Sequence, residues 1–240
     1  MFFYARNLHK SSEIPNFVPI DTPNTMHIAI AGNIGSGKTT LTTLLARHYG
    51  WEPRFEAVTY NPYLEDYYRD IHRWSFNLEV YFLKERFKDA MAIAQSDHTV
   101  IQDRSIYEGV YVFVENNRRM GHLSDRDYET FMELFDHMQT QLRLPDLMVY
   151  LRADITHLVQ NIQQRGRDYE QTIQIEYLQG LNDLYEQFIY QRYPGRVLTI
   201  DVNQMDYLHR PEDLASVINQ IDPLISGLFP LDPNAIASEP

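Results

Sequence analysis

Gly32-Asn33-Ile34-Gly35-Ser36-Gly37-Lys38-Thr39-Thr40 is the stretch that decides the fold of this 240-residue chain. It matches the phosphate-binding pattern G-x-x-x-x-G-K-[ST], whose glycines let backbone N–H groups turn inward around a phosphate without a clash at Cβ. The apolar residues 26–31 before it indicate a short buried strand, and the leucines behind it fall at helical spacing. Because the helix adds its positive N-terminal end to the loop, the stretch predicts a site for the phosphates of a nucleotide.

Two side chains of this loop carry the chemistry expected of it. Lys38 is expected to reach the β- and γ-phosphates of ATP, and Thr39 is expected to hold Mg²⁺. A chance match to the pattern is the alternative, and the flanking strand and helix argue against it.

The composition narrows the class of protein. A net charge of −12 argues against a general nucleic-acid or anionic-membrane binder, because both need a basic surface. The chain has no cysteine, which excludes disulfides, thiolate metal sites and a cysteine nucleophile and agrees with a reducing cytoplasm. No apolar run approaches the length of a membrane span, and the N-terminus lacks the order of a signal peptide. We therefore expect a cytoplasmic protein with no nucleic-acid or membrane partner.

Strand and helix patterns alternate along the chain. Five segments are expected to be strands, at residues 26–31, 51–58, 98–103, 146–151 and 196–202. Helical periodicity between them predicts an α/β fold, a parallel sheet covered by helices on both faces.

The folded domain is expected to span residues 26–229, with residues 1–25 as an N-terminal arm and 230–240 as a C-terminal tail. The arm has three prolines and no clear period, which favours a loosely held segment. The alternative is that its aromatic residues dock on a partner subunit.

Charged residues follow two of the predicted strands. Glu56 lies near the end of the second strand and Asp103-Arg104 at the end of the third, the edge where an open parallel sheet places its ligand. Glu56 can accept a proton from an attacking hydroxyl. Asp103 can hold or orient Mg²⁺, and Arg104 can neutralise charge on a phosphoryl group during transfer. The alternatives are a surface Glu, and a helix-capping Asp beside a surface Arg.

A basic helix end provides the next candidates. Arg165 and Arg167 flank Gly166, where they can form a cationic flap that closes over phosphates and excludes water. An ordinary basic helix terminus, favoured by the helix dipole, is the alternative.

The long helix expected over residues 74–95 presents a mixed face. Glu79, Phe82 and Arg86 are three, four or seven positions apart and therefore align. Phe82 at this spacing is typical of a core, but the two charged residues need a partner or a ligand on a half-apolar face.

Taken in order, these motifs resemble the deoxynucleoside kinase family, and more closely its bacterial deoxyadenosine/deoxyguanosine kinases. The resemblance extends over residues 26–229. It rests on Gly32–Thr40, Glu56, Asn61-Pro62-Tyr63, Trp74-Ser75-Phe76, Asp103-Arg104-Ser105 and Arg165–Glu170. Many NTPases share the phosphate loop alone, whereas the ordered set is much more specific.

The resemblance implies an ATP-dependent, Mg²⁺-using kinase for the 5′-hydroxyl of a deoxynucleoside, with a preference for purines. The implied fold is a P-loop kinase with a five-stranded parallel sheet and an arginine-bearing lid. The implied assembly is a homodimer, or a heterodimer with a related subunit.

The resemblance also implies a role for each candidate residue. Glu56 would be the general base. The phosphates would be clamped by Lys38, Arg104, Arg165 and Arg167, and ATP would bind to the loop of residues 32–40. Thr39 and Asp103 would serve Mg²⁺. The deoxynucleoside would contact Tyr68, Glu79, Phe82, Arg86, Arg104 and Glu170, with Tyr68 and Glu170 on the sugar 3′-hydroxyl.

Two positions depart from the family pattern at the expected base pocket. Glu79 stands where relatives usually carry a Gln that reads the base, and Gly109 stands where relatives often carry an Asp. An ionised Glu only accepts hydrogen bonds, which matches the two adjacent donors of guanine and repels N1 of adenine. The hypothesis is a preference for deoxyguanosine, with Arg86 freed by Gly109 to reach the base. Two alternatives compete: Glu79 pairs with Arg86, or Glu79 is protonated in a dry pocket and imitates Gln.

Two other functions stay open at this point. A nucleoside monophosphate kinase of thymidylate type would need basic residues for the phosphate of its acceptor, and Glu56 is poorly suited to a dianionic acceptor. A catalytically weak, nucleotide-binding scaffold subunit is compatible with the changes at Glu79 and Gly109.

Overall fold

The computed structural model describes residues 25–56, 61–167 and 173–226. Its centre is one sheet with the strand order β2-β3-β1-β4-β5, and all four pairings are parallel. The strands are β1 (His27–Gly32), β2 (Glu52–Arg54), β3 (Val100–Asp103), β4 (Leu147–Arg152) and β5 (Val197–Asp201). The predicted five-stranded parallel sheet is therefore confirmed.

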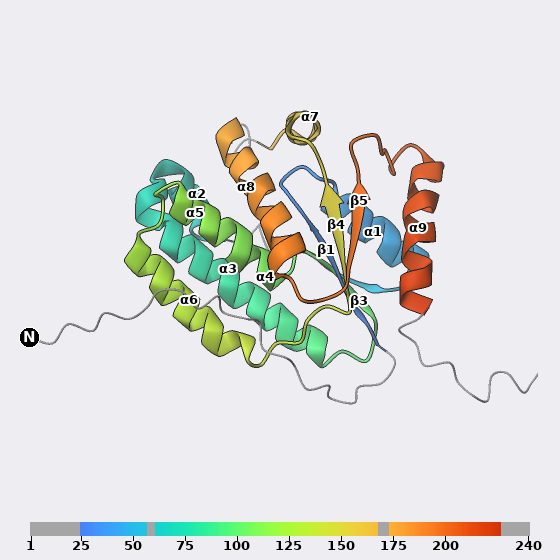
Figure 1. Ribbon diagram of the computed structural model, residues 1–240, viewed down its shortest axis with the longest axis horizontal. Helices are drawn as coiled ribbons and strands as arrows, with labels where there is room; N and C mark the ends of the chain where they lie inside the picture. Colours follow the sequence, from blue (N-terminus) through green and yellow to red (C-terminus); the bar gives the residue numbers. More distant parts are fainter. Residues whose placement is uncertain (1–24, 57–60, 168–172, 227–240) are drawn as a thin grey trace, which may run out of the picture.

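Helices cover both faces of this sheet (Figure 1), with α1 and α9 on one face and α3, α6 and α8 on the other. The α-helices are α1 (Lys38–Tyr49), α2 (Leu64–Arg69), α3 (Ile71–Ala94), α4 (Ile106–Glu108), α5 (Glu115–Arg119), α6 (Asp125–Gln139), α7 (Ile155–Arg165), α8 (Ile175–Gln187) and α9 (Pro211–Ser226). The π-helical segments η1 (Gly109–Val114) and η3 (Phe188–Arg192) continue α4 and α8. Within the described ranges, no helix is both long and apolar enough to cross a lipid bilayer.

The central strand β1 explains why both faces need cover. Successive strand side chains point to opposite faces. Ile28 and Ile30 belong to the apolar cluster on the side of α1 and α9, whereas Ala29 and Ala31 belong to the cluster that includes residues of α3, α6 and α8. Because all four side chains are fully buried, the strand carries a continuous apolar run instead of an alternating one.

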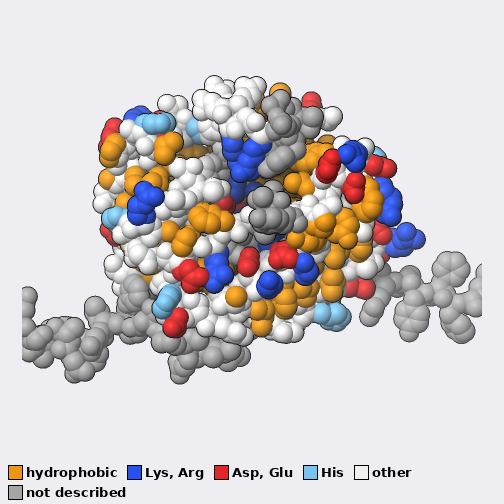
Figure 2. Space-filling view, turned by 180° about the vertical axis from the view of Figure 1, so that it is seen from behind, with side chains coloured by type: hydrophobic (Ala, Val, Ile, Leu, Met, Phe, Trp, Pro, Cys, Tyr) orange, Lys and Arg blue, Asp and Glu red, His pale blue; other side chains and the backbone are white. Residues whose placement is uncertain are grey.

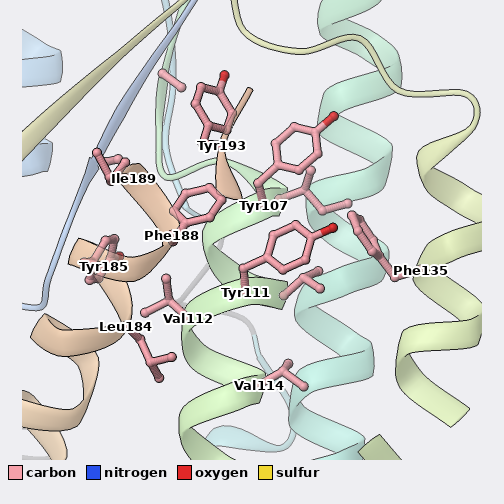
Figure 3. Packing of buried hydrophobic residues seen from close by; sticks show 14 of the residues in the cluster. Tyr107, Tyr111, Val112, Val114, Phe135, Leu184, Tyr185, Phe188, Ile189 and Tyr193 are labelled. Atoms are coloured by element: carbon pink, nitrogen blue, oxygen red, sulfur yellow. The ribbon is translucent and has the colours of Figure 1, made fainter. Parts of the chain in front are cut away.

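An aromatic cluster fixes the helices of the α3 side (Figure 3). Tyr111 of η1 stacks on Phe188 of η3 at a centroid distance of 5.7 Å and meets Phe135 of α6 edge-on at 5.9 Å. Tyr193 meets Phe188 at 5.6 Å and Tyr107 at 6.2 Å. Offset-stacked and edge-to-face contacts are the favoured aromatic geometries, so this cluster holds η1 against α6 and η3.

Three local details differ from the sequence-based expectations. The second strand is shorter than predicted and ends at Arg54, and residues 57–60 lie outside the described part of the chain. Helix α2 was not predicted, because its six residues are too few to show a period. The long helix begins at Ile71, three residues early, because the side chain of Asp70 accepts a hydrogen bond from the backbone N–H of Arg73 at 3.1 Å.

The aromatic cluster yields a stability prediction. Phe135→Ala should lower the free energy of unfolding by about 3–5 kcal/mol, because it removes a fully buried ring and leaves a cavity. Chemical denaturation measures this change. Leu134→Ala, one residue away but 42% exposed, is the control and should cost less than about 1 kcal/mol. Equal costs for the two variants would contradict the packing described here.

Candidate functional site

The phosphate loop connects β1 to α1 at the carboxyl edge of the sheet and is held by α7 behind it. Gly35 has φ 84°, and a Cβ at this position would lie 2.7 Å from the carbonyl oxygen of Leu158 in α7. The side chain of Asn161 in α7 donates a hydrogen bond to the carbonyl oxygen of Gly35 at 2.8 Å. The loop therefore needs glycine here because it lies directly against α7.

A chain of amide side chains holds the loop from the other side. The Nδ2 group of Asn33 donates to Oδ1 of Asn182 at 2.5 Å and to the carbonyl oxygen of Leu178 at 3.0 Å, both in α8. Asn182 in turn donates to the carbonyl oxygen of Ala153 at 2.9 Å. Because Asn33 is buried and its oxygen accepts from the N–H of Ile34, the loop conformation is fixed by bonds that reach α8.

A cavity of 520 Å³ opens in front of the loop. Its wall contains most of the residues expected at the site, namely Ile34, Gly35, Lys38, Thr39, Glu56, Tyr68, Glu79, Phe82, Arg86, Asp103, Arg104, Arg165 and Arg167. The remaining loop residues, Gly32, Asn33, Ser36, Gly37 and Thr40, do not line it. Glu170 lies outside the described residues. The face shown in Figure 2 is hollowed near its centre, and Lys or Arg side chains gather beside the hollow.

Lys38 is buried at the loop end of the cavity, where its Nζ donates to the carbonyl oxygen of Asn33 at 2.8 Å. Burial, and to a smaller degree the charge of Arg104, lowers the pKa of Lys38 to about 8. A negative group beside Nζ would favour the charged form, so this position is suited to a phosphate.

Thr39 and Asp103 are in direct contact. The hydroxyl of Thr39 donates to Oδ2 of Asp103 at 2.5 Å, across the end of β3. A hydroxyl and a carboxylate are the hard oxygen donors that Mg²⁺ prefers, and Mg²⁺ commonly binds through one or two protein oxygens together with phosphates and waters. This donor set therefore fits Mg²⁺ bound with a nucleotide.

Glu56 lies between two guanidinium groups. Arg86 of α3 donates to its Oε1, and Nε of Arg104 is 3.4 Å from its Oε2. Burial alone would raise the pKa of Glu56, but the charges of Arg104, Arg86 and Lys38 outweigh burial and lower it to about 2. Glu56 is therefore ionised throughout the physiological pH range.

Arg104 occupies an unusual backbone position. Among the described residues it is the single non-glycine residue with a positive φ, 71°. Its guanidinium lies over the ring of Phe113 at 4.2 Å and contacts the hydroxyl of Tyr185 at 3.4 Å. Left-handed backbone in a residue with a Cβ costs about 1–3 kcal/mol and tends to occur at functional sites.

Glu79 lies deeper in the cavity and is 5% exposed. Its Oε1 accepts a hydrogen bond from Nδ2 of Asn117 in α5 at 2.8 Å. Burial raises the pKa of Glu79 to about 7, although Arg86 and Asn117 oppose this shift. Of the two alternatives stated above, the raised pKa supports partial protonation of Glu79.

The expectation that Arg86 is free to reach a base is wrong in this structure, because Glu56 binds it. Gly109 matters for another reason: a Cβ at position 109 would lie 2.7 Å from Nη1 of Arg86. The glycine therefore makes room for the guanidinium, which also lies 4.8 Å from the ring centre of Phe82.

Glu108 is a central residue that the sequence analysis did not single out. Its fully buried carboxylate accepts hydrogen bonds from the N–H of Ser105 at 2.8 Å, the hydroxyl of Tyr185 at 3.0 Å and the N–H of Gly32 at 3.3 Å. It thus joins the phosphate loop, the turn after β3 and α8. The spacing Ser105-x-x-Glu108, a capping box, was the available signal.

Comparison with known proteins assigns the family. A family model described as Deoxynucleoside kinase matches residues 28–226, so the chain belongs to this family. It is 36% identical to a deoxyadenosine/deoxycytidine kinase of Bacillus subtilis, over 85% of this chain and 94% of the relative. It is 34% identical to a deoxyguanosine kinase of the same organism, over 82% and 97%. Among solved structures, the deoxyadenosine kinase of M. mycoides with dCMP and a flexible dCDP bound superposes with a TM-score of 0.75, at 29% identity, over 82% of this chain and 100% of the other.

The role of Glu108 is testable. Glu108→Gln should lower the free energy of unfolding by about 1–3 kcal/mol, because an amide replaces one acceptor oxygen and leaves a buried donor unsatisfied. Urea denaturation measures the change. Glu65→Gln is the control, since its carboxylate is 81% exposed in an ion pair with Arg69 and contributes little. If Glu108→Gln left the free energy of unfolding unchanged, the carboxylate would not hold these segments together.

Proposed function

We propose that this protein transfers the γ-phosphoryl group of ATP to the 5′-hydroxyl of a deoxynucleoside, preferably a purine deoxynucleoside, for nucleotide salvage. The observation that supports it most is the placement of Glu56. A carboxylate that is ionised at physiological pH lines the same cavity as Lys38 and Thr39 of the phosphate loop.

In this proposal Glu56 orients the 5′-hydroxyl and accepts its proton. A pKa of about 2 makes Glu56 a weak base. The transition state of phosphoryl transfer is loose, so little proton transfer is needed before the P–O bond to the leaving group breaks. Positioning of the hydroxyl is then the main contribution, and the ion pairs with Arg86 and Arg104 fix the carboxylate for it.

The cations of the cavity stabilise the charge of the transferring group. Lys38 holds the donor phosphates, and Arg104 lies beside Glu56, where the acceptor oxygen and the phosphoryl group meet. Arg165 and Arg167 line the cavity next to the end of α7 and complete the clamp. Thr39 and Asp103 hold Mg²⁺, which neutralises phosphate charge when it is bound.

The purine preference rests on the relatives. Proteins of similar identity to this chain carry the names deoxyadenosine/deoxycytidine kinase and deoxyguanosine kinase. Phe82, Phe113, Tyr67 and Tyr177 line the cavity and offer aromatic surface for a base. A cytoplasmic dimer, and the division into arm, domain and tail, remain part of the proposal.

One assay separates this proposal from its alternatives. Labelled ATP is offered with deoxynucleosides and with nucleoside monophosphates. Labelled deoxynucleoside monophosphates are the expected product. Exclusive formation of diphosphates would indicate a monophosphate kinase, and nucleotide binding with no transfer to any acceptor would indicate a scaffold subunit.

Glu56→Gln should lower kcat by about 10²–10⁴-fold, because the amide orients the 5′-hydroxyl less well and cannot accept its proton. The amide keeps one oxygen for Arg86, so nucleoside binding should persist. Glu52→Gln is the matched control, because Glu52 lies on β2 and pairs with Arg54 away from the cavity. An unchanged kcat at saturating nucleoside would remove Glu56 from the reaction.

The sugar contacts give a separate test. If Tyr68 and Glu170 bind the 3′-hydroxyl, a 2′,3′-dideoxynucleoside should have a lower kcat/KM than the deoxynucleoside, because polar groups of the site lose their partner. Steady-state kinetics on the matched pair measures the ratio. Equal values would rule out these two residues as readers of the sugar.

A further inference from the structure

Glu79 is a buried ionisable group for which phosphoryl transfer has no use. It lines the cavity seven residues before Arg86 on α3, which is about 10 Å along the helix. Arg86 holds Glu56 at the phosphoryl end. If Glu56 binds the 5′-hydroxyl as proposed above, this separation places Glu79 where the far end of the nucleoside, the base, lies.

The neighbours of Glu79 fix which hydrogen bonds it can offer. The hydroxyl of Tyr67 donates to Oδ1 of Asn117 at 3.3 Å, which turns the NH₂ group of Asn117 toward Glu79. The amide therefore occupies one lone pair of Oε1, at 2.8 Å. The second lone pair of Oε1 and the whole of Oε2 remain for a ligand.

The hydrogen bonds that these free positions can form depend on whether Glu79 carries a proton. An ionised Glu79 presents two acceptors, which match the adjacent N1–H and N2–H₂ donors of guanine. With a proton on Oε2 it presents one donor and one acceptor, which match N1 and N6–H₂ of adenine. The ionised form sets an acceptor against N1 of adenine, which is repulsive. The protonated form keeps only one acceptor for the two donors of guanine, and its O–H must turn to O6 instead.

We propose that the protonation state of Glu79 selects the base: the ionised carboxylate accepts guanine, the protonated carboxyl accepts adenine, and the enzyme's preference between the two purine deoxynucleosides therefore changes with pH. This inference rests on the proposed function, because it assigns a base to the deoxynucleoside that the site phosphorylates.

The groups around Glu79 place the change near neutrality. The charged or titratable groups that face it from the surrounding elements are Arg86, Glu56, Arg104, Tyr67 and Tyr177. His122 lines the same cavity and contacts Oδ1 of Asn117 at 3.4 Å, and burial lowers its pKa. Burial raises the pKa of Glu79, the two arginines lower it, Glu56 raises it, and the balance is about 7. Burial also raises the pKa of both tyrosines, so they stay neutral and do not titrate with it.

The test is the ratio of kcat/KM for deoxyguanosine to kcat/KM for deoxyadenosine, measured from about pH 5.5 to 8.5, where neither free base titrates. Both substrates share ATP, Mg²⁺ and the phosphoryl machinery, so the ratio cancels the titration of those groups. We expect it to rise by up to about tenfold per pH unit around the pKa of Glu79. Deoxycytidine, whose N3 and N4–H₂ repeat the acceptor–donor pair of adenine, should follow deoxyadenosine.

Two variants make the assignment specific. Glu79→Gln cannot titrate, so its ratio should be independent of pH and close to the low-pH limit of the wild type, where Glu79 is protonated. Asn117→Ser removes the hydrogen bond that stabilises the ionised form, so the midpoint of the pH dependence should move upward. A structural role of Glu79 alone would produce neither effect.

The possible outcomes distinguish a failure of this inference from a failure of the proposed function. If both purines are phosphorylated and the wild-type ratio does not change with pH, the inference is overturned while the proposed function stands. If the ratio of Glu79→Gln retains the pH dependence, another group causes it and the inference is again overturned. Absence of phosphorylation of all deoxynucleosides at every pH would overturn the proposed function and this inference together.

Discussion

The ion pairs of Glu56 with Arg86 and Arg104 are the interaction on which the rest of the site depends. Both guanidinium groups are buried, at 8% and 6% exposure, and a buried charge without a partner is strongly destabilising. Glu56 pairs with both, and the charges of Glu108 and Asp103 also favour charged Arg104. Two local features serve this arrangement: the missing side chain of Gly109 leaves space for Arg86, and Arg104, whose φ is positive, lies beside Glu56.

The phosphate loop is coupled to the same region by buried polar contacts. Glu108 accepts hydrogen bonds from the N–H of Gly32 and the hydroxyl of Tyr185, and Tyr185 contacts Arg104. On the opposite side, α7 packs against Gly35 and ends at Arg165, a residue of the cavity wall. A shift of α7 would therefore move the loop and the basic end of the helix together, because closely packed elements transmit displacement.

The fold was predictable from sequence because its signals are local. Each signal lies within a short window of sequence: the apolar run Ile28–Ala31, the glycine loop, and each step of the strand–helix alternation. Ser124 is of a residue type that favours helix N-caps, and it caps α6, since its side chain accepts a hydrogen bond from the N–H of Asp127. Ligands of open parallel sheets bind at the carboxyl ends of the strands, so Glu56, Asp103 and Arg104 could also be predicted to lie at one edge of the sheet.

The pairings within the site were not predictable in the same way. Asn117 reaches Glu79 across 38 positions, and Arg86 reaches Glu56 across 30. No periodicity links such residues, because the contacts arise only when α5 and the segment after β2 pack against α3. From the sequence, Arg86 was therefore expected to reach the base, whereas in the structure it pairs with the carboxylate of Glu56.

Two glutamates in one cavity show how the packing divides their roles. Burial raises the pKa of both, but Glu56 lies between two guanidinium groups and has its pKa lowered to about 2, whereas Glu79 receives a neutral amide and has its pKa raised to about 7. The first carboxylate cannot change its charge near neutral pH and so provides a constant anchor for a hydroxyl. The second changes its charge in that range, so its hydrogen-bonding pattern is a variable. Separation of two pKa values by their surroundings is how one site assigns different tasks to the same side chain.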